Sequence, residues 1–441
     1  MSSQVVIIGG GLAGSEAAWQ VAKRGGSAII YEMKPRRFSP AHRMETLAEL
    51  VCSNSLKSDD PMNASGLLKE EMRLMGSLVI KAAEATRVAA GKTLAVDRSE
   101  FSRYVTEVLA GAGVELVREE VRSIPEARPV IVATGPLTTE ELAGDIQALV
   151  GKKSLFFYDA VAPVVYAESI DMSRAFFASR YGKGGEDYIN CPLDREQYER
   201  FVRELKSADG ITPRSFEETR YFEGCLPIEV LAGRGPMTLS FGPMKPVGLV
   251  DPGTGRRPYA VVQLRKENSQ GTLYNMVGFQ TRLTYTEQKR VFGLIPALEK
   301  AEFARLGKIH RNTYMDSPGV ISPGLALLRD QGIFFAGQIT GVEGYCESAA
   351  TGLLAGINAF LSLEGRLSVH PPPTTMTGSL LEYITSEKGS ALQPMNANFG
   401  LLPPLPISVR DKSEKKRLQR ERALGDLQSW LKETLATSPV I

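Results

Sequence analysis

Chemically useful residues gather in two parts of this sequence, and the first is a glycine-rich segment near the N-terminus. The segment follows the apolar run at residues 5–8 and precedes a helix-like stretch. Its glycines permit a tight turn, a close approach of the backbone to a pyrophosphate, and close packing of helix on strand. Glu32 ends the next apolar run, where a carboxylate can bind ribose hydroxyls. The pattern predicts a dinucleotide site, whose glycine-rich residues are Gly9, Gly10, Gly11, Leu12, Ala13 and Gly14.

Four cysteines, at positions 52, 191, 225 and 346, form the second group. They are too few and too scattered for a disulfide framework, and no Cys/His spacing indicates zinc, so we expect free thiols and no metal. Cys52 stands among small polar residues in "LVCSNSLKSDD", where packing offers it no obvious use. Cys191, before a proline, and Cys346 are better explained as small buried hydrophobic residues.

Composition places the chain among ordinary soluble proteins. Its 441 residues are 43% hydrophobic and 23% charged, with a net charge of +2. No apolar run approaches the roughly 20 residues that a membrane span needs, and no basic leader precedes the first strand. We therefore expect a cytoplasmic protein without a membrane partner. The net charge excludes a wholly basic surface but leaves room for a local patch that binds phosphate.

Two later segments favour FAD over a nicotinamide as the dinucleotide. "RPVIVATGPL" reads as a strand that ends near Thr134 and Gly135, and residues 332–360 read as a strand, a glycine-rich loop with Gly337 and Gln338, and a helix. In flavoproteins with two dinucleotide folds, such a late segment returns to the first domain and places a helix N-terminus near the flavin. The predicted fold is α/β, with a discontinuous FAD-binding two-dinucleotide-fold (glutathione-reductase-like) domain and an inserted α+β domain.

We expect an inserted substrate domain at residues 186–300, between parts of the FAD domain at 1–185 and 301–441. Residues 188–205 read as a loop and then an amphipathic helix. The stretches "MTLSFGPM", "YAVVQLRKEN" and "LYNMVGFQT" alternate like antiparallel strands. The helix should bury Tyr198, Phe201, Val202 and Leu205.

A basic C-terminal tail follows two proline-rich linkers. Such a run can bind nucleic-acid phosphates, or it can be a solvated helix face with ion pairs between neighbouring turns. Both interpretations stay open from the run alone. The basic residues are Arg410, Lys412, Lys415, Lys416, Arg417, Arg420 and Arg422, against Asp411, Glu414 and Glu421.

Nine short motifs together give a specific resemblance. They are "CSNSL", "GLLKEEM", "LAVDR", "SRYGKGGEDYINCP", "FEGCLPIE", "SFGPMKPVGL", "VGFQT", "EQKRVF" and "FAGQITGVEGY". In this order, from Val5 to about Asn358, they resemble the bacterial folate- and FAD-dependent tRNA (uracil-5-)-methyltransferases. The resemblance implies methylation of uridine 54 in the tRNA T-loop. It also implies methylenetetrahydrofolate as carbon donor, reduced FAD as reductant, and NADH or NADPH to reduce the flavin.

The resemblance gives a use for two thiols, Cys52 and Cys225. Carbon 5 of uracil is a poor nucleophile until a thiolate adds to carbon 6. Cys225 is our candidate for that nucleophile, and Cys52 for a thiol that assists at the flavin or transfers a proton, although the two roles could be exchanged. Tyr345 is a candidate for stacking near the flavin or folate ring. His310 is a weaker candidate for the folate site.

Two other functions stay in view. One is the related flavoprotein that modifies the wobble uridine of tRNA and shares the glycine-rich start. The other is a flavin-binding protein that has lost catalysis, and the presence of both Cys52 and Cys225 argues against it.

Overall fold

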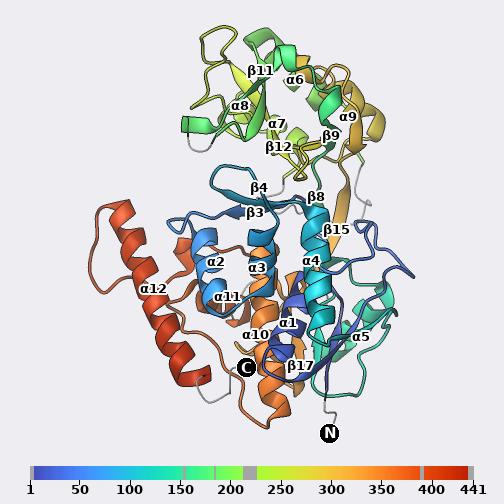
Figure 1. Ribbon diagram of the computed structural model, residues 1–441, viewed down its shortest axis with the longest axis vertical. Coiled ribbons are helices and arrows are strands. Elements are labelled where there is room, and N and C mark those ends of the chain that lie inside the picture. Colours follow the sequence, from blue (N-terminus) through green and yellow to red (C-terminus); the bar gives the residue numbers. More distant parts are fainter. Residues whose placement is uncertain (1–3, 152–154, 183–184, 212–225, 388–391, 436–441) are drawn as a thin grey trace.

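The computed structural model describes residues 4–151, 155–182, 185–211, 226–387 and 392–435. Two units lie along the long axis of the molecule, each built around its own six-stranded sheet (Figure 1). The unit with both termini is drawn in the lower part of Figure 1, and the other stands above it. The candidate site belongs to the lower unit and to its border with the upper one.

The first sheet combines strands from both ends of the chain, in the order β16-β17-β7-β1-β2-β6. All its neighbouring strands pair in parallel except β16 and β17, which are antiparallel. Because the late strand β17 lies beside the early strand β7, this sheet is discontinuous in sequence, as predicted. Its strands are β1 (Gln4–Ile8), β2 (Ser27–Tyr31), β6 (Glu115–Val117), β7 (Val130–Val132), β16 (Ala326–Leu327) and β17 (Asp330–Phe335).

Helices surround this sheet, so its central strands are continuous apolar runs with little exposure. The α/β class is thereby confirmed, while the assignment to glutathione-reductase-like flavoproteins stays a prediction. The helices are α1 (Leu12–Ala22), α2 (Ala64–Leu74), α3 (Leu78–Ala85), α4 (Arg98–Gly111), α5 (Glu140–Val150), α10 (Tyr345–Leu363), α11 (Met376–Thr385) and α12 (Lys412–Leu435).

Helices α1 and α10 pack with almost no space between their backbones. A Cβ on Gly352 of α10 would lie 2.2 Å from the Ala13 carbonyl oxygen, and one on Gly356 would lie 2.5 Å from the Ala17 carbonyl oxygen. No side chain fits at either position. Within the described residues, α10 alone is long and apolar enough to cross a membrane, but 83% of that stretch is buried inside the protein. Its apolar sequence therefore serves internal packing.

Two buried carboxylates tie helices to this core. Glu16 of α1 accepts hydrogen bonds from the amides of Leu78 (3.2 Å) and Val79 (2.9 Å), at the start of α3. Glu71 of α2 accepts from the amides of Met376 (2.6 Å) and Thr377 (2.8 Å), at the start of α11. Burial raises the pKa of Glu71 to about 7, despite these donors. Each carboxylate satisfies helix-start amides that would otherwise lack partners.

The second sheet has the order β10-β11-β12-β13-β9-β14, and its neighbouring strands pair antiparallel. It packs with helices of its own around a separate apolar core. The elements are β9 (Val164–Tyr166), β10 (Phe176–Phe177), β11 (Tyr188–Leu193), β12 (Ala260–Lys266), β13 (Leu273–Met276), β14 (Phe303–Arg305), α6 (Arg195–Ser207), α7 (Ile228–Gly233), α8 (Thr238–Phe241) and α9 (Tyr285–Phe292).

Some predictions for this unit are confirmed and others are wrong. Helix α6 buries the four expected residues, Tyr198, Phe201, Val202 and Leu205. The loop predicted before it is wrong, because residues 188–193 pair with β12 as strand β11. The strand predicted at "MTLSFGPM" is also wrong: residues 238–241 form helix α8, with Leu239 buried and Phe241 exposed. The apolar residues at alternate positions of this stretch therefore lie in one turn of helix and not in a strand.

Two smaller ladders lie where the units meet. Strands β8 (Leu155–Ala160) and β15 (Ile309–Tyr314) pair antiparallel, and β3 (Ser55–Ser58), β5 (Thr93–Val96) and β4 (Arg87–Val88) form a three-stranded sheet. The second sheet takes strands from 164–177 and 303–305 as well as from 186–300. It therefore uses more of the chain than the predicted insertion, and the domain boundaries stay a prediction.

The tight contact between α1 and α10 predicts that Gly356→Ala destabilises the fold by about 1–3 kcal/mol, because the methyl group must push the two helices apart. Gly144→Ala in the exposed part of α5 is the matched control, since a Cβ there meets nothing within 4 Å. That change should be neutral or stabilise by about 0.5–1 kcal/mol. Denaturant unfolding of both variants measures the difference. Equal free energies of unfolding would contradict the packing argument.

Candidate functional site

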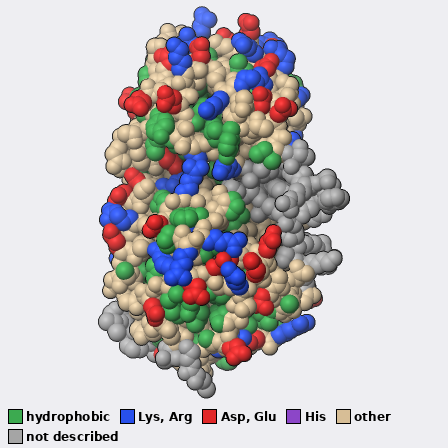
Figure 2. Space-filling view, turned by 90° about the vertical axis from the view of Figure 1, so that its right-hand side faces the viewer, with side chains coloured by type: hydrophobic (Ala, Val, Ile, Leu, Met, Phe, Trp, Pro, Cys, Tyr) green, Lys and Arg blue, Asp and Glu red, His purple; other side chains and the backbone are tan. Residues whose placement is uncertain are grey.

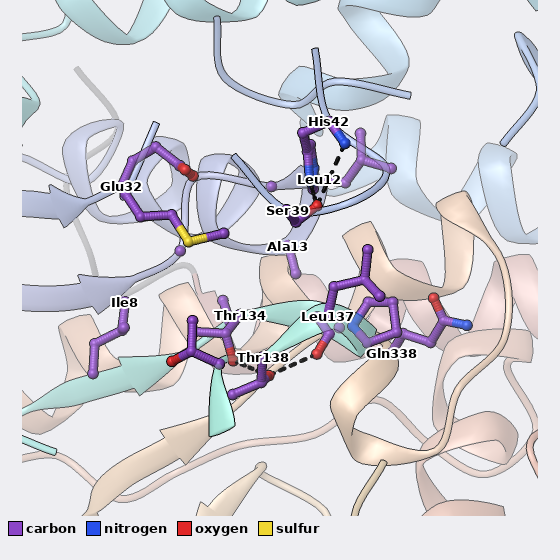
Figure 3. A pocket seen from close by; sticks show the side chains of 18 of the residues that line it. Ile8, Leu12, Ala13, Glu32, Ser39, His42, Thr134, Leu137, Thr138 and Gln338 are labelled. Carbon is purple, nitrogen blue, oxygen red and sulfur yellow. Dashed lines mark hydrogen bonds between the residues drawn. The ribbon is translucent and has the colours of Figure 1, made fainter. Parts of the chain in front are cut away.

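A pocket opens at the carboxyl ends of the parallel strands of the first sheet, where open α/β sheets bind their ligands. Residues from five separate segments, at 8–13, 31–51, 119–121, 133–142 and 337–348, surround this space (Figure 3). Of the predicted cofactor residues, those that line it are Gly9, Gly11, Leu12, Ala13, Glu32, Thr134, Gly135, Gly337, Gln338 and Tyr345.

The glycines have different uses. Gly9 has a φ of +100°, and a Cβ there would lie 2.6 Å from the Ala133 carbonyl oxygen. Gly14 lets helix pack on strand, since its Cβ would lie 1.9 Å from the Gly9 carbonyl oxygen. Gly11 borders the pocket, has an ordinary φ of −73°, and a Cβ there would meet nothing within 4 Å. The fold itself does not require glycine at 11, so the free space fits a ligand phosphate at the start of α1.

Glu32 is held in place at the end of β2. One carboxylate oxygen accepts from the Gly10 amide at 2.8 Å, and the other from the Lys34 amide at 3.0 Å. Gly10 itself does not line the pocket. The carboxylate is buried beside the glycine-rich turn, which is where a ribose of a bound dinucleotide would lie.

The late segment completes the pocket wall. The Gly337 amide donates to Thr351 Oγ1 at 2.7 Å, and Gln338 Nε2 donates to Glu343 at 2.5 Å. Helix α10 then begins at Tyr345, and its first turn faces the pocket. The N-termini of α1 and α10 thus both border one space, and both carry partial positive charge.

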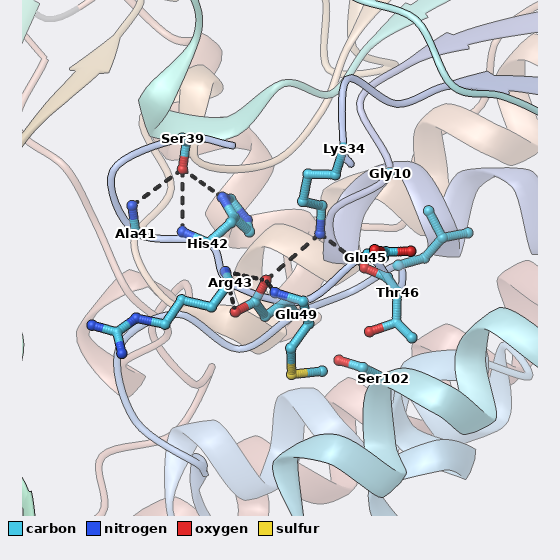
Figure 4. Close-up of polar contacts among 12 residues, drawn as sticks. Gly10, Lys34, Ser39, Ala41, His42, Arg43, Glu45, Thr46, Glu49 and Ser102 are labelled. Atoms are coloured by element: carbon cyan, nitrogen blue, oxygen red, sulfur yellow. Dashed lines mark hydrogen bonds and ion pairs between the residues drawn. The ribbon is translucent and has the colours of Figure 1, made fainter. Parts of the chain in front are cut away.

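Sequence patterns missed the loop that follows β2. Ser39 Oγ lies 2.6 Å from His42 Nδ1 and also accepts from the amide of Ala41 at 3.3 Å (Figures 3 and 4). Ser39 and His42 both line the pocket. No spacing or periodicity marks them, because an irregular loop brings them there.

A buried ion pair between Lys34 and Glu49 stabilises this loop. Lys34 Nζ donates to the Thr46 carbonyl at 2.8 Å and lies 3.7 Å from the Glu49 carboxylate (Figure 4). Burial lowers the pKa of Lys34, and the charges of Glu32 and Glu49 oppose that change. Glu49 itself lines the pocket. The pair therefore holds loop residues against the wall of the site.

Cys52 lies just beyond this wall, on a loop that several distant residues hold. The Tyr345 hydroxyl accepts from the amides of Cys52 (2.7 Å) and Ser53 (3.1 Å). From the other side, Arg305 of β14 donates to the Cys52 carbonyl at 3.1 Å. Since Tyr345 lines the pocket, the thiol-bearing residue is placed between the pocket and the second sheet.

Three arginines and one carboxylate, Glu267, lie around this loop and leave it an excess of positive charge. Arg98 donates to the Leu50 carbonyl and forms an ion pair with Glu267. Arg265 of β12 donates to Asn54 Oδ1 at 2.9 Å. Burial lowers the pKa of Arg305 to about 10, and the charge of a Cys52 thiolate acts in the opposite direction. The thiolate is the reactive form of cysteine, and cations near a cysteine generally favour that form.

The other cysteines differ. Burial raises the pKa of Cys191 to about 12 and that of Cys346 to about 11, so both are inert thiols, as expected. Cys225 lies outside the described residues. His310 belongs to strand β15, but its side chain is also outside the description. In the part of the chain that the structure covers, no cluster of acids, histidines and cysteines could hold a metal.

The basic tail forms α12, and much of its charge is used internally. Arg417 pairs with Glu414 (2.6 Å) and Glu421 (2.5 Å), and Arg420 pairs with Glu70 of α2 at 2.6 Å. The Lys416 ammonium lies 5.6 Å from the centre of the Phe399 ring. These contacts favour the solvated-face interpretation for this part of the helix, and a role in tRNA binding stays a prediction.

Comparisons with known proteins agree on one group. A family model described as "Glucose inhibited division protein A" matches residues 4–367. The chain is 56% identical over 434 residues to "Methylenetetrahydrofolate--tRNA-(uracil-5-)-methyltransferase TrmFO" of Aquifex aeolicus, covering 98% of this chain and 97% of that one. It is 55% identical to the protein of the same name in Geobacter sulfurreducens, covering 98% and 99%.

A solved structure shares the fold. The structure of Aquifex aeolicus GidA in its form II crystal superimposes with a TM-score of 0.68 at 17% identity. The match covers 98% of this chain and 75% of that one.

The open space at Gly11 predicts that Gly11→Val leaves the fold intact but prevents dinucleotide binding, because the side chain takes the place of the pyrophosphate. Flavin absorbance of the purified protein and uptake of added FAD measure binding, and circular dichroism measures folding. Gly111→Val, at the exposed end of α4, is the matched control and should keep normal binding. A Gly11→Val protein that still binds FAD at full occupancy would refute this assignment of the pocket.

Proposed function

Because this chain belongs to the methylenetetrahydrofolate–tRNA-(uracil-5-)-methyltransferase family, we propose that it methylates carbon 5 of uridine 54 in the T-loop of tRNA. The observation that carries the proposal is the placement of Cys52. Its loop is hydrogen-bonded to a tyrosine of the dinucleotide pocket and contacts two buried arginines and the half-buried Arg305. A pocket for a redox cofactor and a thiol in a cationic setting are both needed for this reaction.

The pocket fits FAD in its residues. Gly11 leaves space for the pyrophosphate at the start of α1, and Glu32 would bind the ribose. Bound there in its reduced form, FAD supplies the hydride that completes the methyl group, after methylenetetrahydrofolate has provided the carbon and NADH or NADPH has reduced the flavin. Thr134, Gly135, Gly337 and Gln338 would complete the contacts with the cofactor.

The chain's own nucleophile starts the chemistry. A cysteine thiolate adds to carbon 6 of uracil, which makes carbon 5 nucleophilic toward the one-carbon unit carried by the folate. Once carbon 5 has bonded that carbon and lost its proton, the folate amine leaves, and the thiolate would depart when hydride completes the methyl group. We assign the addition to Cys225, on the resemblance alone. Cys52 would assist beside the flavin or transfer the proton. His310 remains a proposed folate contact, and Tyr345 would present its ring to the flavin or folate.

The surface is compatible with a nucleic-acid partner. Lysine and arginine side chains gather around the middle of the face in Figure 2, close to the level where the two units meet. Such side chains bind phosphates without regard to sequence. Lys412 and Lys415 of α12, together with Lys416, Arg417 and Arg420, stay proposed tRNA contacts. A cytoplasmic location fits this partner.

The rival assignment, to a flavoprotein that acts on the wobble uridine, is less well supported. The chain spans 97% and 99% of the two methyltransferase relatives but 75% of the GidA chain whose fold it shares.

The proposal predicts that the purified flavoprotein converts a tRNA transcript to one with 5-methyluridine when methylenetetrahydrofolate and NADH are present. Nucleoside analysis by mass spectrometry detects the product. Cys52→Ala and Cys225→Ala should each lose turnover while they keep FAD, and Cys191→Ala is the matched control with normal turnover. A wild-type protein that binds FAD and tRNA but forms no 5-methyluridine would contradict the proposal.

The same variants distinguish the roles of Cys52 and Cys225. A tRNA with 5-fluorouridine at the target position should trap the attacking cysteine, because fluorine does not leave as a proton does. We expect the adduct to map to Cys225 and to survive in Cys52→Ala. A peptide map that places the adduct on Cys52 would exchange the two roles.

A further inference from the structure

A second hollow lies in the upper unit and shares no lining residue with the dinucleotide pocket. It holds about 1070 Å³ between the junction of β11 and α6, the turn at 251–259, and residues 293–299. In Figure 1, β11 and α6 stand at the end of the molecule opposite the N-terminus. The hollow is therefore a separate surface feature, which the chemistry above does not use.

Arginines dominate the charge of this hollow. Two of the five that line it are neutralised: Arg174 pairs with Glu299 at 3.0 Å, and Arg195 pairs with Glu199 at 2.7 Å. The other three, Arg200, Arg256 and Arg257, are exposed, and none of their guanidinium groups has a carboxylate partner among the described residues. Three unneutralised guanidinium groups thus share one concave surface.

The acids of the hollow are occupied by local contacts. Asp194 accepts from the Gln197 amide at 2.8 Å and caps α6. Asp251 accepts from the Gly253 amide at 2.9 Å, within its own turn. Glu299 is the partner of Arg174. Asp194 and Asp251 keep their negative charges, but five arginines against Asp194, Asp251 and Glu299 leave the lining with an excess of positive charge.

The turn that carries two of these arginines is closed by its own backbone. The Asp251 amide donates to the Arg256 carbonyl at 2.9 Å, and the Gly255 amide donates to the Asp251 carbonyl at 2.8 Å. Pro258 follows directly and restricts the chain further. Adjacent arginines on an ordered turn lose less conformational freedom on binding than arginines on a mobile loop.

We propose that this hollow binds backbone phosphates of the tRNA, on a part of the molecule away from the T-loop. The inference rests on the proposed function, since tRNA is the polyanion that the enzyme must hold. A guanidinium group matches the geometry of phosphate oxygens, and several such groups along a wide, open surface suit a phosphodiester chain better than a small ligand. A folded tRNA carries phosphates on every arm, so an arm other than the T-arm would supply the phosphates that bind here.

The test is tRNA binding by the FAD-loaded full chain at several salt concentrations. The variant replaces Arg200, Arg256 and Arg257 together by Gln. At roughly 0.1 M salt the affinity should fall about tenfold or more, and the slope of log K against log salt should flatten by roughly two to three. Replacing the same three arginines by Lys should preserve most of the affinity and most of the salt dependence. A control triple, Lys81→Gln, Arg329→Gln and Lys432→Gln, removes the same charge from exposed sites outside the hollow and should leave the slope unchanged.

Measuring turnover distinguishes a failure of this inference from a failure of the proposed function on which it rests. In the Arg200, Arg256 and Arg257 variant, KM for tRNA should rise while kcat for 5-methyluridine formation stays at the wild-type value. An unchanged affinity and slope would overturn the inference, as would the same loss in the control triple. A variant that also binds inorganic phosphate or pyrophosphate less tightly, with tRNA affinity intact, would assign the hollow to a small anion instead. Failure of the proposed function would appear differently, as absent 5-methyluridine in the wild type.

Discussion

The hydrogen bonds that hold the Cys52 loop are the interaction on which the rest of the site depends. Tyr345 accepts from two successive amides of the loop, and Arg305 donates to the carbonyl of the same cysteine. One partner belongs to the wall of the dinucleotide pocket and the other to the second sheet. The backbone of Cys52 is therefore held at the border of the two units.

The position of Tyr345 depends in turn on helix packing far from any ligand. Gly352 and Gly356 let α10 lie directly on Ala13 and Ala17 of α1. This contact sets both helix N-termini against the same pocket, one beside the glycine-rich turn and one carrying Tyr345. The contact between α1 and α10 thus sets the position of Tyr345 and of the hydrogen bonds that it accepts from the Cys52 loop.

Local chemistry could be predicted from the sequence, and contacts between distant segments could not. The glycine-rich turn, Glu32 and the late strand were predicted because their requirements are local: backbone conformation, helix start and an apolar run. Strand β11 was missed because its pairing with β12 joins residues about 70 positions apart, which a local pattern does not reveal. Ser39, His42 and the arginines around Cys52 were missed for the same reason, since irregular loops and tertiary packing bring them to the site.

The most direct measurement is the rate at which iodoacetamide modifies Cys52, followed by peptide mass mapping at neutral pH. The account predicts that Cys52 reacts well before the buried Cys191 and Cys346. It also predicts that Arg305→Gln slows the reaction several-fold with FAD content unchanged, while Arg305→Lys keeps most of the rate, because a nearby cation favours the thiolate. An equal or faster rate in Arg305→Gln would contradict the claim that the second sheet positions and activates this thiol.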